Sequence, residues 1–174
     1  DRLGFRIEKL DVLLMNESNI SSTRIREAIQ LGDFATANAF LGYPFALHGT
    51  VVEGQKLGRK IQFPTANVEA SDPEKIIPGY GVYVVKVKVQ NRIYHGMLNI
   101  GSRPTINHNA DHRSIEVHIF DFESDIYGAS IELLFYAKLR EEQKFPSIDA
   151  LKEQLNQDKT DTLAYFQSLQ DEIN

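Results

Sequence analysis

The sequence predicts a mainly β protein, a small antiparallel barrel of five or six strands with helices at both ends of the chain. From residue 45 onward, short segments alternate apolar and polar side chains, which is the period of a strand with one buried face. Turn-forming residues separate these segments, and no helical pattern lies between them. A parallel α/β sheet needs a helix after each strand, so the pattern favours an antiparallel barrel.

The N-terminal segment is predicted to form a mainly helical tail. Residues 5–15 have a strand-like pattern, and Ser21-Ser22-Thr23 then offers N-cap side chains to a helix. One face of that helix is apolar and carries Ile25, Ala28 and Ile29.

A boundary between two units is expected near residue 43. Gly32-Asp33 ends the first helix and starts a second over residues 34–41, which stops at Gly42-Tyr43-Pro44. Residues 1–43 are therefore one predicted unit and residues 44–174 the other.

The strands of the second unit can be placed individually. Residues 85–89 alternate strictly, Gln90-Asn91-Arg92 forms a tight turn, and residues 93–100 return as the second arm of a hairpin. Two further strands are predicted over residues 114–122 and 131–139, the latter alternating around Leu133 and Phe135.

The strand over residues 114–122 places Ile115, Val117 and Ile119 on one face and Glu116 and His118 on the other. Two short helices, over residues 148–157 and 161–169, are predicted to close the chain. Their expected core residues are Leu151, Leu155, Leu163 and Phe166.

Composition limits the class of protein. The 174 residues are 42% hydrophobic, enough to fill the core of one domain with an extension. Acidic residues outnumber basic ones by 24 to 19, and the net charge of -5 argues against sequence-independent binding of nucleic acid. The absence of cysteine excludes disulfides, thiolate metal sites and thiol nucleophiles.

No apolar run is long enough to span a bilayer and no leader sequence opens the chain, so no membrane partner is expected. The lack of cysteine fits a cytoplasmic location, which is the expected one. The chain begins with Asp1 rather than Met. We interpret it as a fragment or a processed form.

The most informative motif is Phe63-Pro64-Thr65-Ala66-Asn67. If the chain runs extended after the proline, the period of two residues places the Thr65 hydroxyl and the Asn67 amide on one face. Mg²⁺ takes a few protein oxygens and completes its octahedron with water and substrate phosphates, so Thr65 and Asn67 are candidate ligands for Mg²⁺ or another divalent metal. The alternative is an ordinary strand that begins after a turn.

Five separated segments, over the last three quarters of the chain, together resemble bacterial riboflavin kinase. They are GTVVEG and GRKIQFPTAN within residues 49–67, GVY at 81–83, NIGSRPT at 99–105, EVHIFDF at 116–122 with DIYG at 125–128, and LREEQKF at 139–145. ISSTRIR at residues 20–26 resembles the closing motif of the adenylyltransferase half of bifunctional riboflavin kinase/FAD synthetases, which precedes the kinase in that family.

The resemblance implies a six-stranded Greek-key barrel that transfers a phosphoryl group from ATP to the terminal ribityl hydroxyl of riboflavin, giving FMN and ADP. Such a transfer requires charge neutralisation, alignment and a base near the attacking hydroxyl. The expected partners are the small molecules ATP, riboflavin and FMN. The full-length protein is expected to carry a covalently attached adenylyltransferase domain that converts FMN to FAD. Residues 1–43 are interpreted as the C-terminal remnant of that domain.

The glycine-punctuated loop before Pro64 fits the phosphates of ATP. Its backbone N–H groups can face phosphate oxygens, and three basic side chains add positive charge. The candidate nucleotide-binding residues are Gly54, Lys56, Gly58, Arg59, Lys60, Thr65 and Asn67. The loop is not a Walker A motif, because it lacks the Gly-Lys-Ser/Thr ending at the required spacing.

Glu116 matches the catalytic glutamate of the family and is the candidate general base; the alternative is a solvated carboxylate on the wet face of a strand. Arg140 is the candidate flavin-binding residue, and the alternative is a surface ion pair with Glu141 or Glu142. His118 shares the face of Glu116 and is interpreted as structural.

The sequence departs from the family pattern at Gln62, where the family usually has glycine before FPTAN. If that position needs a positive φ or a close approach to the nucleotide, the glutamine side chain imposes a steric cost.

Two other functions stay open. The barrel could be a catalytically inactive module that binds flavin or nucleotide. An adenylyltransferase activity of this chain is disfavoured, because the His-x-Gly-His motif of that domain does not occur in the sequence.

Overall fold

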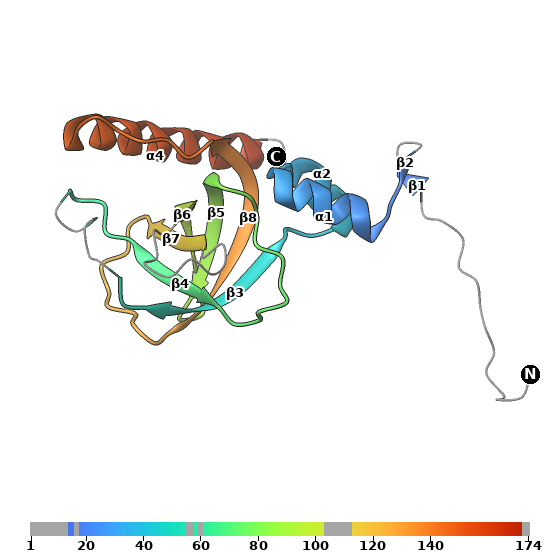
Figure 1. Cartoon of the computed structure of the whole chain (residues 1–174), viewed down its shortest axis with the longest axis horizontal. Helices are drawn as coiled ribbons and strands as arrows, with labels where there is room; N and C mark the ends of the chain where they lie inside the picture. The colour runs from blue at the N-terminus through green and yellow to red at the C-terminus, as the bar shows by residue number, and fades with distance from the viewer. Residues whose placement is uncertain (1–13, 16–17, 55–57, 59–60, 103–112, 172–174) are drawn as a thin grey trace, which may run out of the picture.

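Figure 1 shows the chain in a computed structural model that describes residues 14–15, 18–54, 58, 61–102 and 113–171. The elements, in chain order, are β1 Leu14–Met15, β2 Ser18–Asn19, α1 Ser22–Leu31, α2 Phe34–Leu41, β3 Ala46–Val52, β4 Ala66–Ala70, β5 Gly81–Val89, β6 Arg92–Ser102, β7 Arg113–Ile119, β8 Ser130–Arg140 and α4 Ile148–Asp171. Most of the strand predicted over residues 5–15 lies outside the described residues, and its last two residues form β1, which pairs with β2.

Six strands close into the predicted antiparallel barrel. Their spatial order is β3-β4-β7-β6-β5-β8, and β8 pairs with β3 to complete the ring. The three consecutive strands β5, β6 and β7 are neighbours, and β8 returns to lie beside β5. This arrangement is a Greek key, in which the fourth strand lies next to the first.

The alternation predicted for β7 is confirmed. Ile115, Val117 and Ile119 are buried in the barrel core, whereas Glu116 is half-buried on the outer face. Leu133 and Phe135 of β8 belong to the same core and are fully buried. The inner face of the barrel is therefore apolar, and polar side chains of the outer face are available to form a site.

The turn of the β5–β6 hairpin is one residue shorter than predicted. Val89 pairs with Arg92, so the loop consists of Gln90 and Asn91 alone. Their φ angles are 50° and 60°, as a two-residue turn that follows the right-handed twist of its strands requires.

The two N-terminal helices are capped as the sequence predicted and pack on the barrel. The Ser21 side chain accepts a hydrogen bond from the Arg24 amide, and Gly32 ends α1 with a left-handed φ of 80°. Phe34 of α2 lies among aromatic rings of the barrel, with its ring centroid 5.0 Å from that of Phe135 and 5.7 Å from that of Tyr83.

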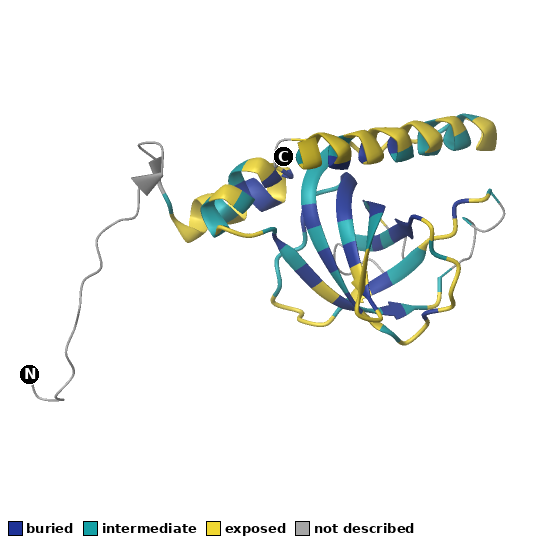
Figure 2. Ribbon diagram, turned by 180° about the vertical axis from the view of Figure 1, so that it is seen from behind, coloured by how far each residue is buried: buried dark blue, intermediate teal, exposed yellow. Residues whose placement is uncertain are grey.

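The C-terminal segment forms one helix, so the prediction of two short helices was wrong. Helix α4 runs through residues 158–160, which the two predicted helices left out, and the Thr160 and Thr162 hydroxyls donate to carbonyls one turn back at 2.9 and 2.7 Å. Of the predicted core residues, Phe166 is buried and Leu163 is 42% exposed. Helix α4 lies across the barrel with its exposed residues on the outer side (Figure 2).

Candidate active site

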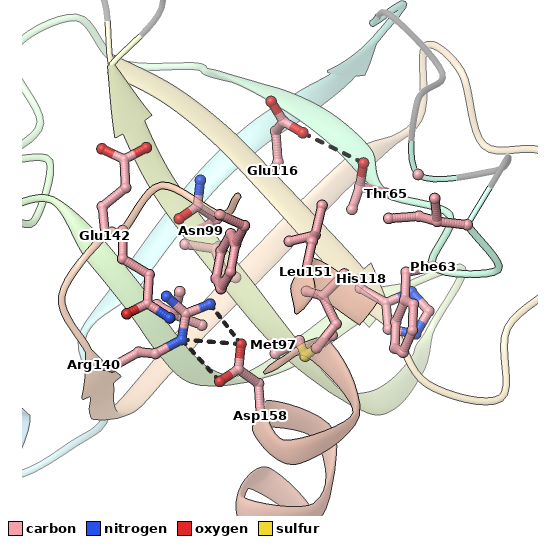
Figure 3. A pocket seen from close by; sticks show the side chains of 17 residues that line it. Phe63, Thr65, Met97, Asn99, Glu116, His118, Arg140, Glu142, Leu151 and Asp158 are labelled. Atoms are coloured by element: carbon pink, nitrogen blue, oxygen red, sulfur yellow. Dashed lines mark hydrogen bonds and ion pairs between the residues drawn. The ribbon is translucent and has the colours of Figure 1, made fainter. Parts of the chain in front are cut away.

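A pocket of about 300 Å³ lies on the outer face of the barrel beneath α4 and is called the α4 pocket below. Its walls come from the outer faces of β6 and β7, from residues 140–145 at and after the end of β8, and from α4 (Figure 3). Among its lining residues are Thr65, Met97, Asn99, Glu116, His118, Arg140, Phe145, Leu151, Leu155 and Asp158. Most of its surface is apolar, and its polar groups are few and localised.

Glu116 lies at the centre of a polar row across three strands. Asn67 of β4 pairs with Glu116 of β7, and Asn99 of β6 pairs with it on the other side. Side chains of directly opposed residues lie on the same face of a sheet, so an amide flanks the carboxylate on each side. Glu116 is half-buried and lines the α4 pocket together with residues of α4.

The Thr65 hydroxyl lies next to this row. Its Oγ1 is 3.5 Å from Glu116 Oε2, a contact drawn in Figure 3. Asn67 packs against Gly54, where an added Cβ would collide with the Asn67 amide. A hydroxyl, an amide and a carboxylate thus share one face, and these hard oxygen donors fit Mg²⁺ when substrate phosphates and water complete its octahedron.

A second pocket of about 460 Å³ opens at one end of the barrel interior. It is lined by the inward-facing Val51, Val117 and Ile119 and by residues 122–127, and we call it the barrel-end pocket. Thr65 also lines it, and is the residue shared by the two pockets within the described part of the chain. The two cavities therefore approach each other from the outer and inner sides of the barrel wall at Thr65.

The glycine-punctuated loop connects β3 to β4 beside both pockets. The Gly58 carbonyl accepts hydrogen bonds from the Ile61 and Phe63 amides at 3.2 and 2.9 Å, which makes a tight turn. An added Cβ at Gly58 would collide with the Phe63 carbonyl, so this position requires glycine. The candidate residues Lys56, Arg59 and Lys60 lie outside the described residues.

Gln62 adopts a left-handed conformation with φ of 66° and is exposed. This is the backbone geometry that glycine accepts most easily, and the departure noted from the sequence therefore falls on a position with a real steric requirement. The turn brings the residues on either side of Gln62, Ile61 and Phe63, to the wall of the α4 pocket.

His118 is buried and its ring is fixed on three sides. Its Nδ1 lies 2.7 Å from the Pro64 carbonyl oxygen, and its ring centroid is 5.2 Å from that of Phe63 and 5.5 Å from that of Phe120. Burial lowers the pKa of His118; the hydrogen bond to Pro64 opposes this effect, and the charge of Lys159 adds to it. The ring is therefore neutral at neutral pH.

Arg140 forms an ion pair with Asp158 of α4. The alternative considered from the sequence was a surface ion pair with Glu141 or Glu142, and the partner is Asp158 instead. Its Nη2 donates to Asp158 Oδ2 at 2.8 Å and its Nε to Oδ1 at 2.9 Å. Asp158 is 2% exposed, and Gln154 donates to its Oδ1 at 2.9 Å. Arg140 lines the α4 pocket together with Glu116, so the structure brings these two predicted residues to the same cavity.

Three features of the site were given no role from the sequence: Asn99, Asp158 and residues 122–127, although Asn99 and most of residues 122–127 stand in the segments that resemble the family. Asp158 carried a usable signal, because it falls on the stripe that α4 turns to the barrel, at helical spacing from Leu155 and Thr162. A carboxylate inside such a stripe indicates a buried partner. The opposition of Asn99 to Glu116 depends on strand register and had no local signal.

The family model and the sequence relatives agree on one family. The family model described as riboflavin kinase matches residues 41–166. The bifunctional riboflavin kinase/FMN adenylyltransferase of Bacillus subtilis is 42% identical over 161 residues, which are 92% of this chain and 51% of that protein. The protein with the same description from Haemophilus influenzae is 43% identical over 168 residues, 96% of this chain and 53% of that protein. The chain thus spans about half the length of these relatives.

Two solved structures resemble the fold. One is described as a macrolide-efflux protein from Streptococcus pneumoniae, with a TM-score of 0.81 and 38% identity over 87% of this chain and 49% of that one. The other is a riboflavin kinase from Trypanosoma brucei, with a TM-score of 0.51 and 26% identity over 73% of this chain and 79% of that one.

No helix in the described part of our chain is long and apolar enough to cross a membrane.

Proposed function

The chain belongs to the riboflavin kinase family, and on that premise we propose that it transfers the γ-phosphoryl group of ATP to the 5′-hydroxyl of the ribityl chain of riboflavin, giving FMN and ADP. ATP and riboflavin are the substrates of this family. The proposal concerns this chain, which covers half of its bifunctional relatives.

The meeting of two pockets at Thr65 carries the proposal. Phosphoryl transfer needs two substrates whose reacting atoms come together in line while the rest of each molecule is bound separately. The α4 pocket suits riboflavin, because Met97, Leu151 and Leu155 offer apolar walls to a flat ring system. The barrel-end pocket suits ATP, because it adjoins the strands that flank the glycine-punctuated loop. The reacting groups then meet beside Thr65 and Glu116.

Glu116 acts as the general base in this scheme. Its carboxylate accepts the proton of the ribityl hydroxyl as the hydroxyl oxygen bonds to the γ-phosphorus and the bond from that phosphorus to the β-phosphate bridging oxygen breaks. ADP leaves with the electron pair of that bond. Arg140 lies on another side of the α4 pocket (Figure 3), where it contacts the flavin or the segment that covers it.

Mg²⁺, or another divalent metal, is held by the Thr65 hydroxyl and the Asn67 amide oxygen in this proposal. When bound, it neutralises charge on the phosphates of ATP. The chain's own groups bind and orient the nucleotide: Gly54 and Gly58 by close approach of the backbone, and three basic residues by charge. These basic residues are Lys56, Arg59 and Lys60.

We also propose the division of the chain into residues 1–43, the C-terminal remnant of an adenylyltransferase domain, and residues 44–174, the kinase domain. The start of the matching family model at residue 41 supports it. The full-length protein then carries the adenylyltransferase domain and makes FAD from FMN, as the description of its relatives implies. A cytoplasmic location fits a soluble enzyme with these substrates.

Incubation of the purified chain with riboflavin, ATP and MgCl₂, followed by chromatographic separation of the flavins, tests the proposal. FMN and ADP should accumulate in equal amounts, and EDTA should stop the reaction. A chain that binds riboflavin, as measured by quenching of flavin fluorescence, and forms no FMN with any divalent metal would instead be an inactive binding module.

A further inference from the structure

The site contains a hydrogen bond that the proposed chemistry does not use, between the His118 ring and the Pro64 carbonyl. Strand β4 begins at Ala66, which pairs with Val117 of β7, and Asn67 pairs with Glu116. The same antiparallel register, continued by one residue, sets Thr65 opposite His118. Pro64 has no N–H, so a regular ladder cannot continue through it.

The imidazole of His118 bonds instead to the carbonyl of Pro64. A carbonyl oxygen only accepts hydrogen bonds, so Nδ1 carries the proton and donates it to Pro64 across 2.7 Å. The flanking rings of Phe63 and Phe120 fix the orientation of the imidazole, and the residue is 9% exposed. The carbonyl immediately before Thr65 is thus fixed to β7 by a side chain.

Glu116 and His118, two residues apart on β7, therefore contact two successive residues, Thr65 and Pro64. Glu116 lies 3.5 Å from the Thr65 hydroxyl, and His118 holds the preceding carbonyl. Thr65 is exposed and lies outside the strand ladder, so the contact with Glu116 alone is a weak constraint on its position.

We propose that His118 is a positioning residue, which acts through the Pro64 carbonyl to hold the Thr65 hydroxyl beside Glu116 where the two pockets meet. The inference rests on the proposed function in assigning Thr65 a part in the reaction. The inference gives His118 a role through the Pro64 carbonyl, which differs from that of a second general base on the same face of β7.

Two variants of the same shape isolate the hydrogen bond. His118→Asn keeps a donor on the atom bonded to Cγ, near the position of Nδ1, whereas His118→Leu has the same branching and no donor. His118→Leu should lower kcat at least 10-fold and raise the Mg²⁺ concentration for half-maximal rate, with the riboflavin dissociation constant changed less than 3-fold. His118→Asn should recover most of the lost kcat. Equal losses of kcat in the two variants would overturn the proposal.

A double-variant cycle with Thr65→Ala tests whether His118 acts through Thr65. In the Thr65→Ala background, His118→Leu should lower kcat by less than 2-fold, because the hydroxyl that it positions is already absent. If His118→Leu lowers kcat by the same factor in the parent and in the Thr65→Ala background, His118 does not act through Thr65, and the positioning role is refuted.

Nuclear magnetic resonance tests the inference without any kinase assay. The imidazole ¹⁵N shifts of His118 should report a proton on Nδ1, and amide exchange at Ala66, where the β4 ladder begins, should be at least 10-fold faster in His118→Leu than in the parent, with the exchange of core residue Val85 unchanged. If the leucine variant does not fold, His118→Gln takes its place in the comparison with His118→Asn. The amide of glutamine lies one bond further from the backbone than that of asparagine. A proton on Nε2 alone, or unchanged exchange at Ala66, contradicts the inference. Absence of FMN formation by the parent chain contradicts only the proposed function.

Discussion

Arg140 at the end of β8 and Asp158 in the middle of α4 form a two-point ion pair across the α4 pocket, with Nη2 2.8 Å from Oδ2 and Nε 2.9 Å from Oδ1. The side chains are 19% and 2% exposed. The pair fastens the helix that covers the pocket to the strand that forms its wall, so its effects should reach both stability and flavin binding.

Removal of one partner should be costly, because it leaves the other charge buried without compensation. Asp158→Ala is expected to lower the free energy of unfolding by about 3–5 kcal/mol in urea titrations and to weaken riboflavin binding. Glu141→Gln is the matched control, since the Lys138–Glu141 pair has a similar N–O distance of 2.7 Å but a carboxylate that is 78% exposed. That control should cost less than about 1 kcal/mol. Equal losses of unfolding free energy in the two variants would show that the buried ion pair does not stabilise the attachment of α4.

Glu116→Gln keeps the shape of the side chain and removes its basic oxygen. The kcat for FMN formation should fall by on the order of 10², while the riboflavin dissociation constant stays within a few-fold of the parent. Glu69→Gln provides the control, because Glu69 is exposed on the strand of Asn67 and lines neither pocket. A kcat for Glu116→Gln close to that of the control would leave Glu116 as a structural carboxylate.

Loss of a metal ligand should appear in the metal dependence of the rate. Thr65→Ala and Asn67→Ala are each expected to lower turnover and to raise the Mg²⁺ concentration needed for half-maximal rate, because each removes one of the proposed protein oxygens. Thr65→Ser retains the hydroxyl and should keep a curve near that of the parent. Titrations of rate against MgCl₂ at fixed ATP measure the effect. Unchanged curves for both alanine variants would remove the metal assignment.

Gln62→Gly should relieve backbone strain beside the pocket. A left-handed residue with a side chain costs roughly 1–2 kcal/mol, and the extra freedom that glycine gives the unfolded chain offsets part of the gain. The variant is expected to unfold at equal or higher urea concentration and to show an equal or lower KM for ATP. Ser71→Gly, at an exposed position without positive φ, should only destabilise. A marked loss of activity in Gln62→Gly would reveal a role for the glutamine side chain.

The parts of the site that lie close together in sequence could be predicted, and the parts that depend on distant pairing could not. The period of a strand was enough to place Thr65 with Asn67, and Glu116 with His118, on common faces. Which residue opposes Glu116 depends on the register of β4, β6 and β7, which alternation does not determine.

The two helices predicted over residues 148–157 and 161–169 left residues 158–160 between them, and the structure has one continuous helix there. Asp158, in that interval, forms the ion pair with Arg140. That pair joins residues 18 positions apart, beyond the reach of helix-capping and periodicity rules.

Stability should fall in mildly acidic solution because two histidines are neutral and partly or largely buried in the native state. Burial lowers the pKa of His118, and burial followed by the charge of Lys86 lowers that of His95, with Asp121 opposing. A base with a lowered native pKa binds its proton more readily when unfolded, so the stabilisation is complete above the ordinary value of 6.5 and is lost as the pH falls through the native pKa. His95 stacks on Phe166 of α4 with centroids 4.1 Å apart, so His95→Phe keeps an aromatic contact and removes the titration. Urea titrations at pH 8 and pH 5 should show a smaller loss of stability in His95→Phe than in the parent. An equal loss in both proteins would mean that other groups govern the acid sensitivity.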